Sequence, residues 1–185
     1  IGPGLGEFVS YCNDHDVKTI DVIDYEKEVL DYVSSKFEIK SGFISSDIQP
    51  LEKKLRMYDI IMITQVLEHI PTEKHIPYLQ TLYNHLNGGG VILITVPNIG
   101  NPLAIYERYY DYTHETAFTD HSLLQMVDFA HLANSQVNVQ GFHIPTYNLI
   151  NIMRSGIQYL LHGLFKLLFI VNGGVYPKIL TTNIT

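Results

Sequence analysis

The chain has 185 residues, of which 46% are hydrophobic and 17% are charged, and this composition excludes a disordered protein. The length is sufficient for a substantial hydrophobic core. A formal net charge of −7 argues against a nucleic-acid binder, because such proteins normally carry a basic face. The single Cys12 excludes an internal disulfide and fits a reducing compartment, so we expect a cytoplasmic location.

Hydrophobic periodicity and breaker residues predict alternating strands and helices in the first half of the chain. In chain order, we expect a helix over 7–14, a strand over 18–24, a helix over 26–36, a strand over 42–46, a strand over 59–64, a helix over 72–86 and a strand over 91–96. Such alternation is typical of an α/β protein with a mainly parallel, doubly wound sheet. Ligands then bind at the carboxyl ends of the strands.

The second half of the chain is less regular. Residues 98–118 are rich in Tyr and are expected to form a cap or acceptor loop. A helix should begin at Thr119 or Asp120 and reach about Ala133. Strands are expected over 136–144 and 175–184. The apolar segment 149–171 predicts a helix that is short for a membrane span. This helix could cover a sheet edge, form a homodimer contact or lie on a membrane surface, and the three alternatives stay open.

The opening residues read as the end of a buried strand, a glycine-rich turn and the start of a helix. Gly2, Gly4 and Gly6 alternate in this turn, and glycine adopts positive φ and allows a ligand to approach the backbone. A strand, a glycine turn and a helix N-terminus together form a corner typical of nucleotide-binding proteins. The chain opens inside this motif without a Met, so we expect it to be truncated within its first strand.

Asp24 ends the second expected strand, where an acid can bind both hydroxyls of a ribose. It could instead cap the helix that follows Tyr25. Tyr25 itself could be a core residue. Asp47 follows the third expected strand and could cap the turn before Pro50.

Five motifs occur together in one order and spacing. They are the glycine turn, Asp24, Ser46-Asp47-Ile48, Gln65-Val66-Leu67-Glu68-His69, and Asn87-Gly88-Gly89-Gly90 before an apolar strand. Over residues 1–145 the sequence resembles the class I S-adenosylmethionine-dependent methyltransferases. It is most similar to the branch with Val-Leu-Glu-His after the fourth strand, which includes bacterial polysaccharide-associated and quinone methyltransferases. The resemblance implies a seven-stranded Rossmann-like sheet and a single domain over residues 1–185.

The resemblance also implies S-adenosylmethionine as the cofactor and assigns residues to it. It places the glycine turn beside the amino-acid and ribose parts, Asp24 at the ribose hydroxyls, Tyr25 against the adenine, Asp47 and Ile48 at the adenine edge, and Gln65 in the pocket lining. Quinone methyltransferases that resemble this chain carry Glu where Gln65 stands. Carboxylates suit hard divalent cations better than amides do, so we expect no metal.

A hydroxyl acceptor usually needs a base, and histidine is the natural candidate because its pKa lies near neutrality. His69 follows the fourth strand, and His114 lies in an Asp-x-Thr-His element that faces the acceptor in the family it resembles. Loop-ordering hydrogen bonds are the alternative role for both. We expect methyl transfer to an oxygen of a small or glycan-type acceptor in polysaccharide biosynthesis. A catalytically silent, cofactor-binding or structural paralogue that assembles through the C-terminal helix is the alternative, and an oxidoreductase would instead bind NAD.

Overall fold

The computed structural model describes residues 1–132 and 136–185, which divide into two compact units. Unit 1 comprises residues 1–67 and 73–94, and unit 2 comprises residues 68–72 and 95–185. The single domain expected over residues 1–185 stays a prediction, and each unit is described by itself.

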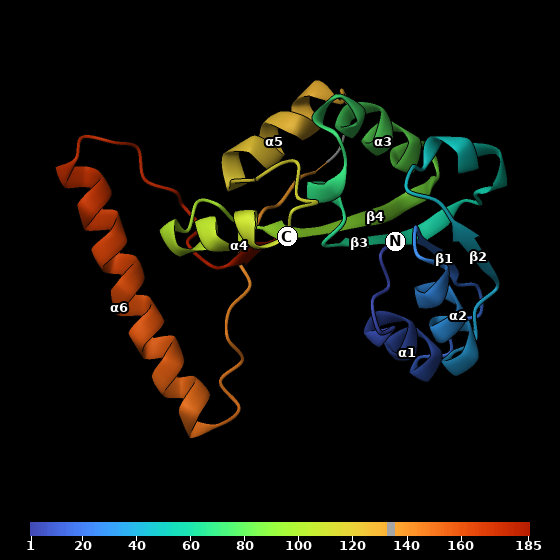
Figure 1. The fold of residues 1–185 in the computed structure, drawn as a ribbon, viewed down its shortest axis with the longest axis horizontal. Coiled ribbons are helices and arrows are strands. Elements are labelled where there is room, and N and C mark those ends of the chain that lie inside the picture. The colour runs from blue at the N-terminus through green and yellow to red at the C-terminus, as the bar shows by residue number, and fades with distance from the viewer. Residues whose placement is uncertain (133–135) are drawn as a thin grey trace. The chain divides into compact units, whose positions relative to one another are not determined.

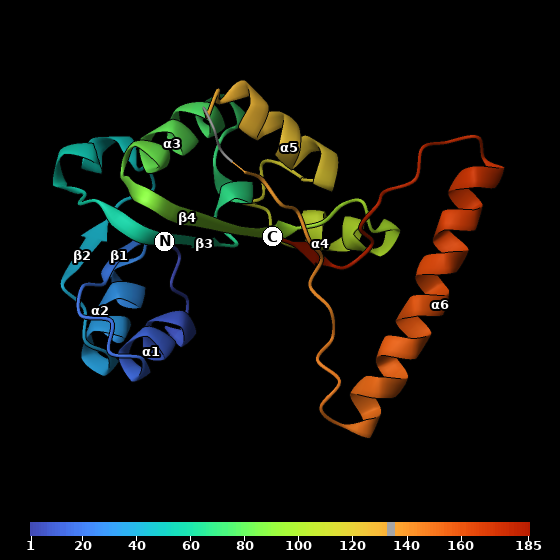
Figure 2. The same cartoon turned by 180° about the vertical axis from the view of Figure 1, so that it is seen from behind.

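Unit 1 contains the alternating strands and helices that the sequence predicts. Its elements are α1 (Glu7–Asp14), β1 (Asp21–Asp24), α2 (Lys27–Lys36), β2 (Ser41–Ile44), a 3-10 helix (Gln49–Lys54), β3 (Tyr58–Thr64), α3 (Thr72–Asn84) and β4 (Leu86–Pro97). The first residue of α3 and the last three residues of β4 belong to unit 2. Within unit 1, α3 lies on one side of the strands, and α1 and α2 lie on the other (Figures 1 and 2). Helices on both faces are the doubly wound arrangement expected from the alternation.

The core beneath α1 and α2 is small and aliphatic. Val9 of α1, Val22 of β1, and Leu30 and Val33 of α2 are buried together, and Phe37 packs against them. Leu30 and Val33 are spaced by three residues and lie on one face of α2, the spacing from which the sequence predicts this helix. The helix over 7–14 is confirmed in full, and α2 begins one residue later than expected.

The strands form two sheets rather than the single seven-stranded sheet that we expected. Among the described residues there are five strands: β1 pairs with β2 in parallel, and β3, β4 and β5 (Asn183–Ile184) form a second sheet in that order. The chain start bridges the backbones of β1 and β3, since the Ile1 amine donates to the Met62 carbonyl at 2.7 Å and the Gly2 amide donates to the Ile23 carbonyl at 3.0 Å. The further strand expected before Ile1 stays a prediction.

Unit 2 has fewer regular elements. They are two 3-10 turns (Leu67–His69 and Pro102–Ala104), α4 (Ile105–Tyr110), α5 (Asp120–Phe129), α6 (Leu149–Val171) and β5. The first residue of the first turn, Leu67, belongs to unit 1. Thr119 caps α5 through a capping box with Ser122. This agrees with the expectation that the helix begins at Thr119 or Asp120. The expected end of this helix at Ala133 lies outside the described residues.

Two expected strands in unit 2 are wrong. In the described part of 136–144 the backbone forms only an isolated bridge at Gly141, which pairs with Ile184. Of the strand expected over 175–184, only β5 forms, and it pairs antiparallel with the end of β4, with Ile184 opposite Val96. By contrast, β4 is longer than expected, since it begins at Leu86 and includes the glycines that we expected to end the preceding helix.

The helix α6 runs over the expected residues 149–171 and is joined to the rest of its unit by extended segments (Figure 1). Asn148 caps it, since its side chain accepts a hydrogen bond from the Asn151 amide at 2.8 Å. In the part of the chain that the structure describes, no helix has the length and apolar character needed to cross a membrane.

Candidate active site

The glycine turn leads directly into α1. Gly2, Gly4 and Gly6 all have positive φ, at 64°, 54° and 86°, and Gly6 precedes the first residue of the helix. A side chain on Gly2 would overlap Val66, whereas one on Gly4 would meet no described heavy atom within 4 Å. Gly2 is therefore required by packing as well as by conformation, and Gly4 leaves open space above the backbone for a ligand.

Alanine substitution should separate these two roles. We expect Gly2→Ala to lower the free energy of unfolding by about 2–5 kcal/mol, because positive φ and the overlap with Val66 both cost energy. Gly4→Ala should cost about 1–2 kcal/mol, since only the backbone conformation is strained. Urea denaturation of the two variants measures the difference. Equal losses of stability would contradict the packing role assigned to Gly2.

Asp24 ends β1 and is partly buried. Its Oδ1 accepts a hydrogen bond from the Glu26 amide at 2.9 Å, so the carboxylate shapes the turn into α2. A carboxylate has a second oxygen that can accept from a ribose hydroxyl, and both roles can therefore coexist. Tyr25 is 66% exposed, which excludes the alternative that it is a core residue.

Asp47 and Ile48 follow β2. The Asp47 carboxylate accepts from the Gln49 amide at 3.2 Å and from the Lys74 ammonium at 3.0 Å. Partial burial alone would raise the pKa of Asp47, but these bonds and the Lys74 charge hold that pKa below its usual range. The Ile48 side chain is buried. The turn-capping alternative for Asp47 is therefore present in the structure.

Gln65 follows β3 directly and has a positive φ of 52°. Such a backbone conformation costs about 1–2 kcal/mol for a residue other than glycine. Strained residues of this kind cluster at ligand sites. The sequence identified Gln65 by its position in a motif and gave no sign of its conformation.

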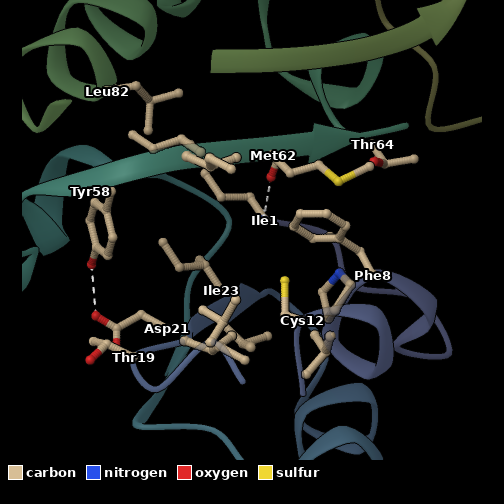
Figure 3. A pocket seen from close by; sticks show the side chains of 18 of the residues that line it. Ile1, Phe8, Cys12, Thr19, Asp21, Ile23, Tyr58, Met62, Thr64 and Leu82 are labelled. Atoms are coloured by element: carbon tan, nitrogen blue, oxygen red, sulfur yellow. Dashed lines mark hydrogen bonds between the residues drawn. The ribbon is translucent and has the colours of Figure 1, made fainter. Parts of the chain in front are cut away.

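A cavity of about 630 Å³ lies between β1 and β3 within unit 1 (Figure 3). Its wall includes Asp21, whose carboxylate accepts from Tyr58 at 2.8 Å and from Arg56 at 2.8 Å. Of the residues predicted to bind the cofactor, Gly2, Gly4, Ile48 and Gln65 line the cavity. Its lining among the described residues does not include Gly6, Asp24, Tyr25 or Asp47.

Unit 2 brings His69 and His114 together, with their ring centroids 4.7 Å apart. The Thr113 hydroxyl lies 2.8 Å from His69 Nδ1 and donates its own hydrogen to Asp111 at 2.7 Å. Thr113 must therefore accept from His69 Nδ1, which leaves His69 Nε2 without a hydrogen in the neutral ring. Burial, together with the charge of His114, lowers the pKa of His69 and favours this neutral form.

His114 is held in the same tautomer. Its Nδ1 lies 3.1 Å from the Glu107 carbonyl, which can only accept, so this nitrogen donates. The Nε2 atom of a neutral His114 therefore carries a free electron pair. Such a nitrogen can accept a proton from an acceptor hydroxyl, which is the chemistry expected of a general base.

Glu68 completes this cluster, and sequence reasoning did not single it out as a site residue. Its side chain is 1% exposed, and neither carboxyl oxygen has a hydrogen-bond partner among the described residues. Burial, with a smaller contribution from the charge of Asp111, raises the pKa of Glu68 from 4.5 to about 7. The Glu68 carbonyl accepts from the Glu115 and Thr116 amides at 2.8 and 3.1 Å, which fixes the backbone. The signal that could have revealed Glu68 is an acid beside His69 in an otherwise apolar run.

The raised pKa of Glu68 predicts a pH-dependent stability. The contribution of Glu68 to the free energy of unfolding is fully present below pH 4.5 and is lost as the pH rises to about 7. The cause is that the Glu68 carboxyl ionises more readily in the unfolded chain than in the folded protein. The loss amounts to about 3 kcal/mol. Glu68→Gln cannot ionise, so its unfolding free energy should rise by this amount relative to the wild type between acidic and weakly alkaline pH. Chemical denaturation across this range measures the change.

Glu115→Gln is the matched control, because Glu115 is an exposed carboxylate in the same unit. The gain in unfolding free energy of Glu68→Gln should exceed any change in Glu115→Gln, because Glu68 is buried and Glu115 is exposed. A Glu68→Gln variant that loses stability at alkaline pH would contradict the prediction and would show that the ionised carboxylate has a cationic partner.

The same three side chains could bind a metal ion. Glu68, His69 and His114 each offer one ligand atom, and these atoms lie within 4.8 Å of one another. Two imidazole nitrogens and a carboxylate form a ligand set that suits zinc and similar divalent ions. The arrangement can hold a shared proton or a cation, and our expectation of no metal stays a prediction.

The expected cap over residues 98–118 exposes several aromatic side chains. Tyr106, Tyr109, Tyr110 and Tyr112 are 69–101% exposed. Asn98 serves the fold of its own unit, because its buried side chain donates to the Ile179 and Thr181 carbonyls and accepts from the Gly100 amide. The exposed tyrosines are therefore better placed than Asn98 to contact an acceptor.

Comparisons with known proteins agree with this fold. A structure described as a SAM-dependent methyltransferase from Archaeoglobus fulgidus has a TM-score of 0.67 and 18% identity, with coverage of 99% of this chain and 80% of that chain. An S-adenosylmethionine-dependent methyltransferase from Mesorhizobium loti has a TM-score of 0.63 and 11% identity, with coverage of 85% and 82%. The plantazolicin methyltransferase BpumL, in complex with SAH, has a TM-score of 0.58 and 18% identity, with coverage of 88% and 68%.

These similarities show that the chain has the α/β methyltransferase fold. No curated protein matches the sequence. The model of a family described as a methyltransferase domain matches residues 1–137, which is well over half of the chain and includes every predicted site residue. The chain therefore belongs to this methyltransferase domain family.

Proposed function

We propose that this chain transfers a methyl group from S-adenosylmethionine to an oxygen of a small or glycan-type acceptor. The observation that carries the proposal is the tautomer of His114, whose Nδ1 hydrogen is held by the Glu107 carbonyl and whose Nε2 is free to take a proton. The structural neighbours support the cofactor, since their descriptions name S-adenosylmethionine or its demethylated product.

Unit 1 fits this cofactor through its own residues. The open backbone at Gly4 allows close approach of a ligand, and the second oxygen of Asp24 can accept from a ribose hydroxyl. When bound, the cofactor supplies a sulfonium methyl group that is electrophilic and leaves its bonding electron pair on sulfur. The role of unit 1 is to hold and orient this group.

Unit 2 supplies the acid–base chemistry and the acceptor contacts. His114 Nε2 accepts the proton of the acceptor hydroxyl as the new carbon–oxygen bond forms. His69 is neutral beside it, and the hydrogen bond to Thr113 fixes its ring. The exposed tyrosines of residues 106–112 suit a sugar ring, because aromatic faces pack against rings while their hydroxyls bind polar groups.

Calorimetry on the full-length protein tests the cofactor, with S-adenosylmethionine, S-adenosylhomocysteine and NAD as ligands. We expect the first two to bind at micromolar concentrations and NAD not to bind. An acceptor screen by mass spectrometry, beginning with nucleotide sugars, then tests methyl transfer. Binding of NAD alone would overturn the proposal in favour of an oxidoreductase. Binding of the cofactor without transfer to any hydroxyl acceptor would favour the catalytically silent paralogue.

A further inference from the structure

The charges of this chain are segregated along its sequence. All 19 acidic residues lie at or before Asp128, where they outnumber nine of the basic residues. The remaining 57 residues contain Arg154, Lys166 and Lys178 and no acid. This acid-free segment contains α6, the most apolar helix of the protein. The charged side chains of the segment are therefore all basic, although the whole protein is negatively charged. Such a pattern indicates an anionic partner for this segment.

The helix α6 turns its apolar side away from its own unit. At 3.6 residues per turn, nine aliphatic side chains fall within an arc of about 100°. They are Leu149, Ile150, Met153, Ile157, Leu160, Leu164, Leu167, Leu168 and Val171, and each is 50–78% exposed. We call this surface the apolar arc. A patch of this size on one helix marks an interaction site.

The opposite side of α6 faces inward and carries polar side chains together with the partly buried Phe165 and Phe169. Asn151 is buried and donates to the Pro145 carbonyl at 2.9 Å, and His162 and Lys166 are partly buried on the same side. The Lys166 ammonium lies 5.9 Å from the centre of the Tyr176 ring. Because the inward side makes these contacts within unit 2, the outward direction of the apolar arc follows from the packing of the helix.

A cavity of about 330 Å³ lies along this helix, and Lys166 and Lys178 are its cations. His143 and His162 also line it, and burial, together with the charges of Lys166 and His143, lowers the pKa of His162 and favours its neutral form. Among the described residues the lining of this cavity contains no acidic side chain. Tyr159 and Gly163, which also line the cavity, lie on the flank of α6 between its inward side and the apolar arc. A phosphate group in this cavity would therefore lie close to the border of the apolar surface.

We propose that α6 lies on the surface of an anionic phospholipid bilayer, with the apolar arc in the acyl region and a lipid phosphate in the cation-lined cavity. A helix with an aliphatic face and a cationic polar border is typical of interfacial membrane binding. No helix among the described residues is long and apolar enough to cross a bilayer. The inference does not depend on the proposed methyl acceptor.

A second copy of this chain is a less suitable partner. Lys166 lies on the side of α6 opposite the apolar arc, so two facing arcs would leave it without an anionic partner, and the acid-free segment has no carboxylate side chain to pair with it. An anionic bilayer attracts the cations of this segment, whereas the same segment of a second copy adds only further cations. The charges therefore favour the lipid surface.

Flotation of the full-length protein with lipid vesicles tests the proposal. We expect binding to vesicles of phosphatidylcholine mixed with phosphatidylglycerol, and little binding to phosphatidylcholine alone. Leu164→Asp should weaken binding at least roughly tenfold, because a buried Leu side chain is worth that much or more. Lys166→Ala and Lys178→Ala should each weaken it about fivefold. Added salt should lower the binding of the wild type.

Phe129→Asp is the matched control, because Phe129 is 65% exposed in the same unit but lies on α5. It should bind as the wild type does, and circular dichroism should show that Leu164→Asp remains folded, since Leu164 is exposed. Absence of wild-type binding, or equal binding to neutral and anionic vesicles, would overturn the proposal. A dimer in analytical ultracentrifugation that Leu164→Asp dissociates, without vesicle binding, would also overturn it and identify a second copy as the partner.

Discussion

Replacement of His114 by alanine is expected to lower kcat by about two to four orders of magnitude, the usual contribution of a general base. The variant loses the Nε2 electron pair that accepts the acceptor proton and also the Nδ1 donor to the Glu107 carbonyl. Affinity for S-adenosylmethionine should be unchanged, because the predicted cofactor residues are not altered. Steady-state kinetics with an identified acceptor, together with calorimetry, measures both quantities.

His114→Asn distinguishes a base from a residue that only orders the loop. The asparagine amide can still donate to the Glu107 carbonyl, but it cannot accept a proton near neutral pH. We expect Asn to be as inactive as Ala, with the rate no longer rising with pH on the acidic side of the profile. His121→Ala is the control, since His121 is an exposed residue of α5 and should keep full activity. Recovery of activity in His114→Asn would reject the base.

Asp24→Ala should weaken the binding of S-adenosylmethionine by about two to four orders of magnitude. Each hydrogen bond to a charged acceptor contributes about 1.5–3 kcal/mol, and the side chain is expected to accept from two ribose hydroxyls. The same substitution removes the acceptor of the Glu26 amide, so the free energy of unfolding should fall by about 1 kcal/mol as well. Calorimetry with S-adenosylhomocysteine and thermal melts measure the two effects separately.

Asp24→Asn keeps an oxygen for the Glu26 amide and removes the charge. We expect it to melt like the wild type and to bind the cofactor less tightly. Asp31→Ala is the matched control, because Asp31 is an exposed acid of α2 that pairs with Lys27. If Asp24→Ala changed only the melting temperature, Asp24 would be a turn-capping residue and the assignment to the ribose would be wrong.

Local patterns predicted the helices of this chain because their causes are local. The ends of α1 and α6 follow from the turn at Gly6 and the cap at Asn148, which contact residues within one helical turn. The division into two sheets could not be read in this way. It depends on which strand edges meet, and β1 and β3 are bridged by the backbone of Ile1 and Gly2 instead of pairing with each other.

The histidine cluster was predicted in part. The chemistry of histidine predicts His69 and His114 as site residues. The contact between His69 and Thr113 joins residues 44 positions apart, and no periodicity reveals it. Glu68 was missed as a site residue because its isolation from hydrogen-bond partners is a property of the packed state. Buried titratable groups of this kind require coordinates, since their pKa depends on the surroundings.

The left-handed backbone of Gln65 places two selective pressures on one position. In a saturation library, a screen for folding should enrich Gly and Asn at residue 65, because these residues adopt positive φ at lower cost. A screen for methyl transfer should enrich Gln if its amide contacts the ligand. The divergence of the two enrichment profiles would then measure how much stability the protein gives up for its chemistry at this position.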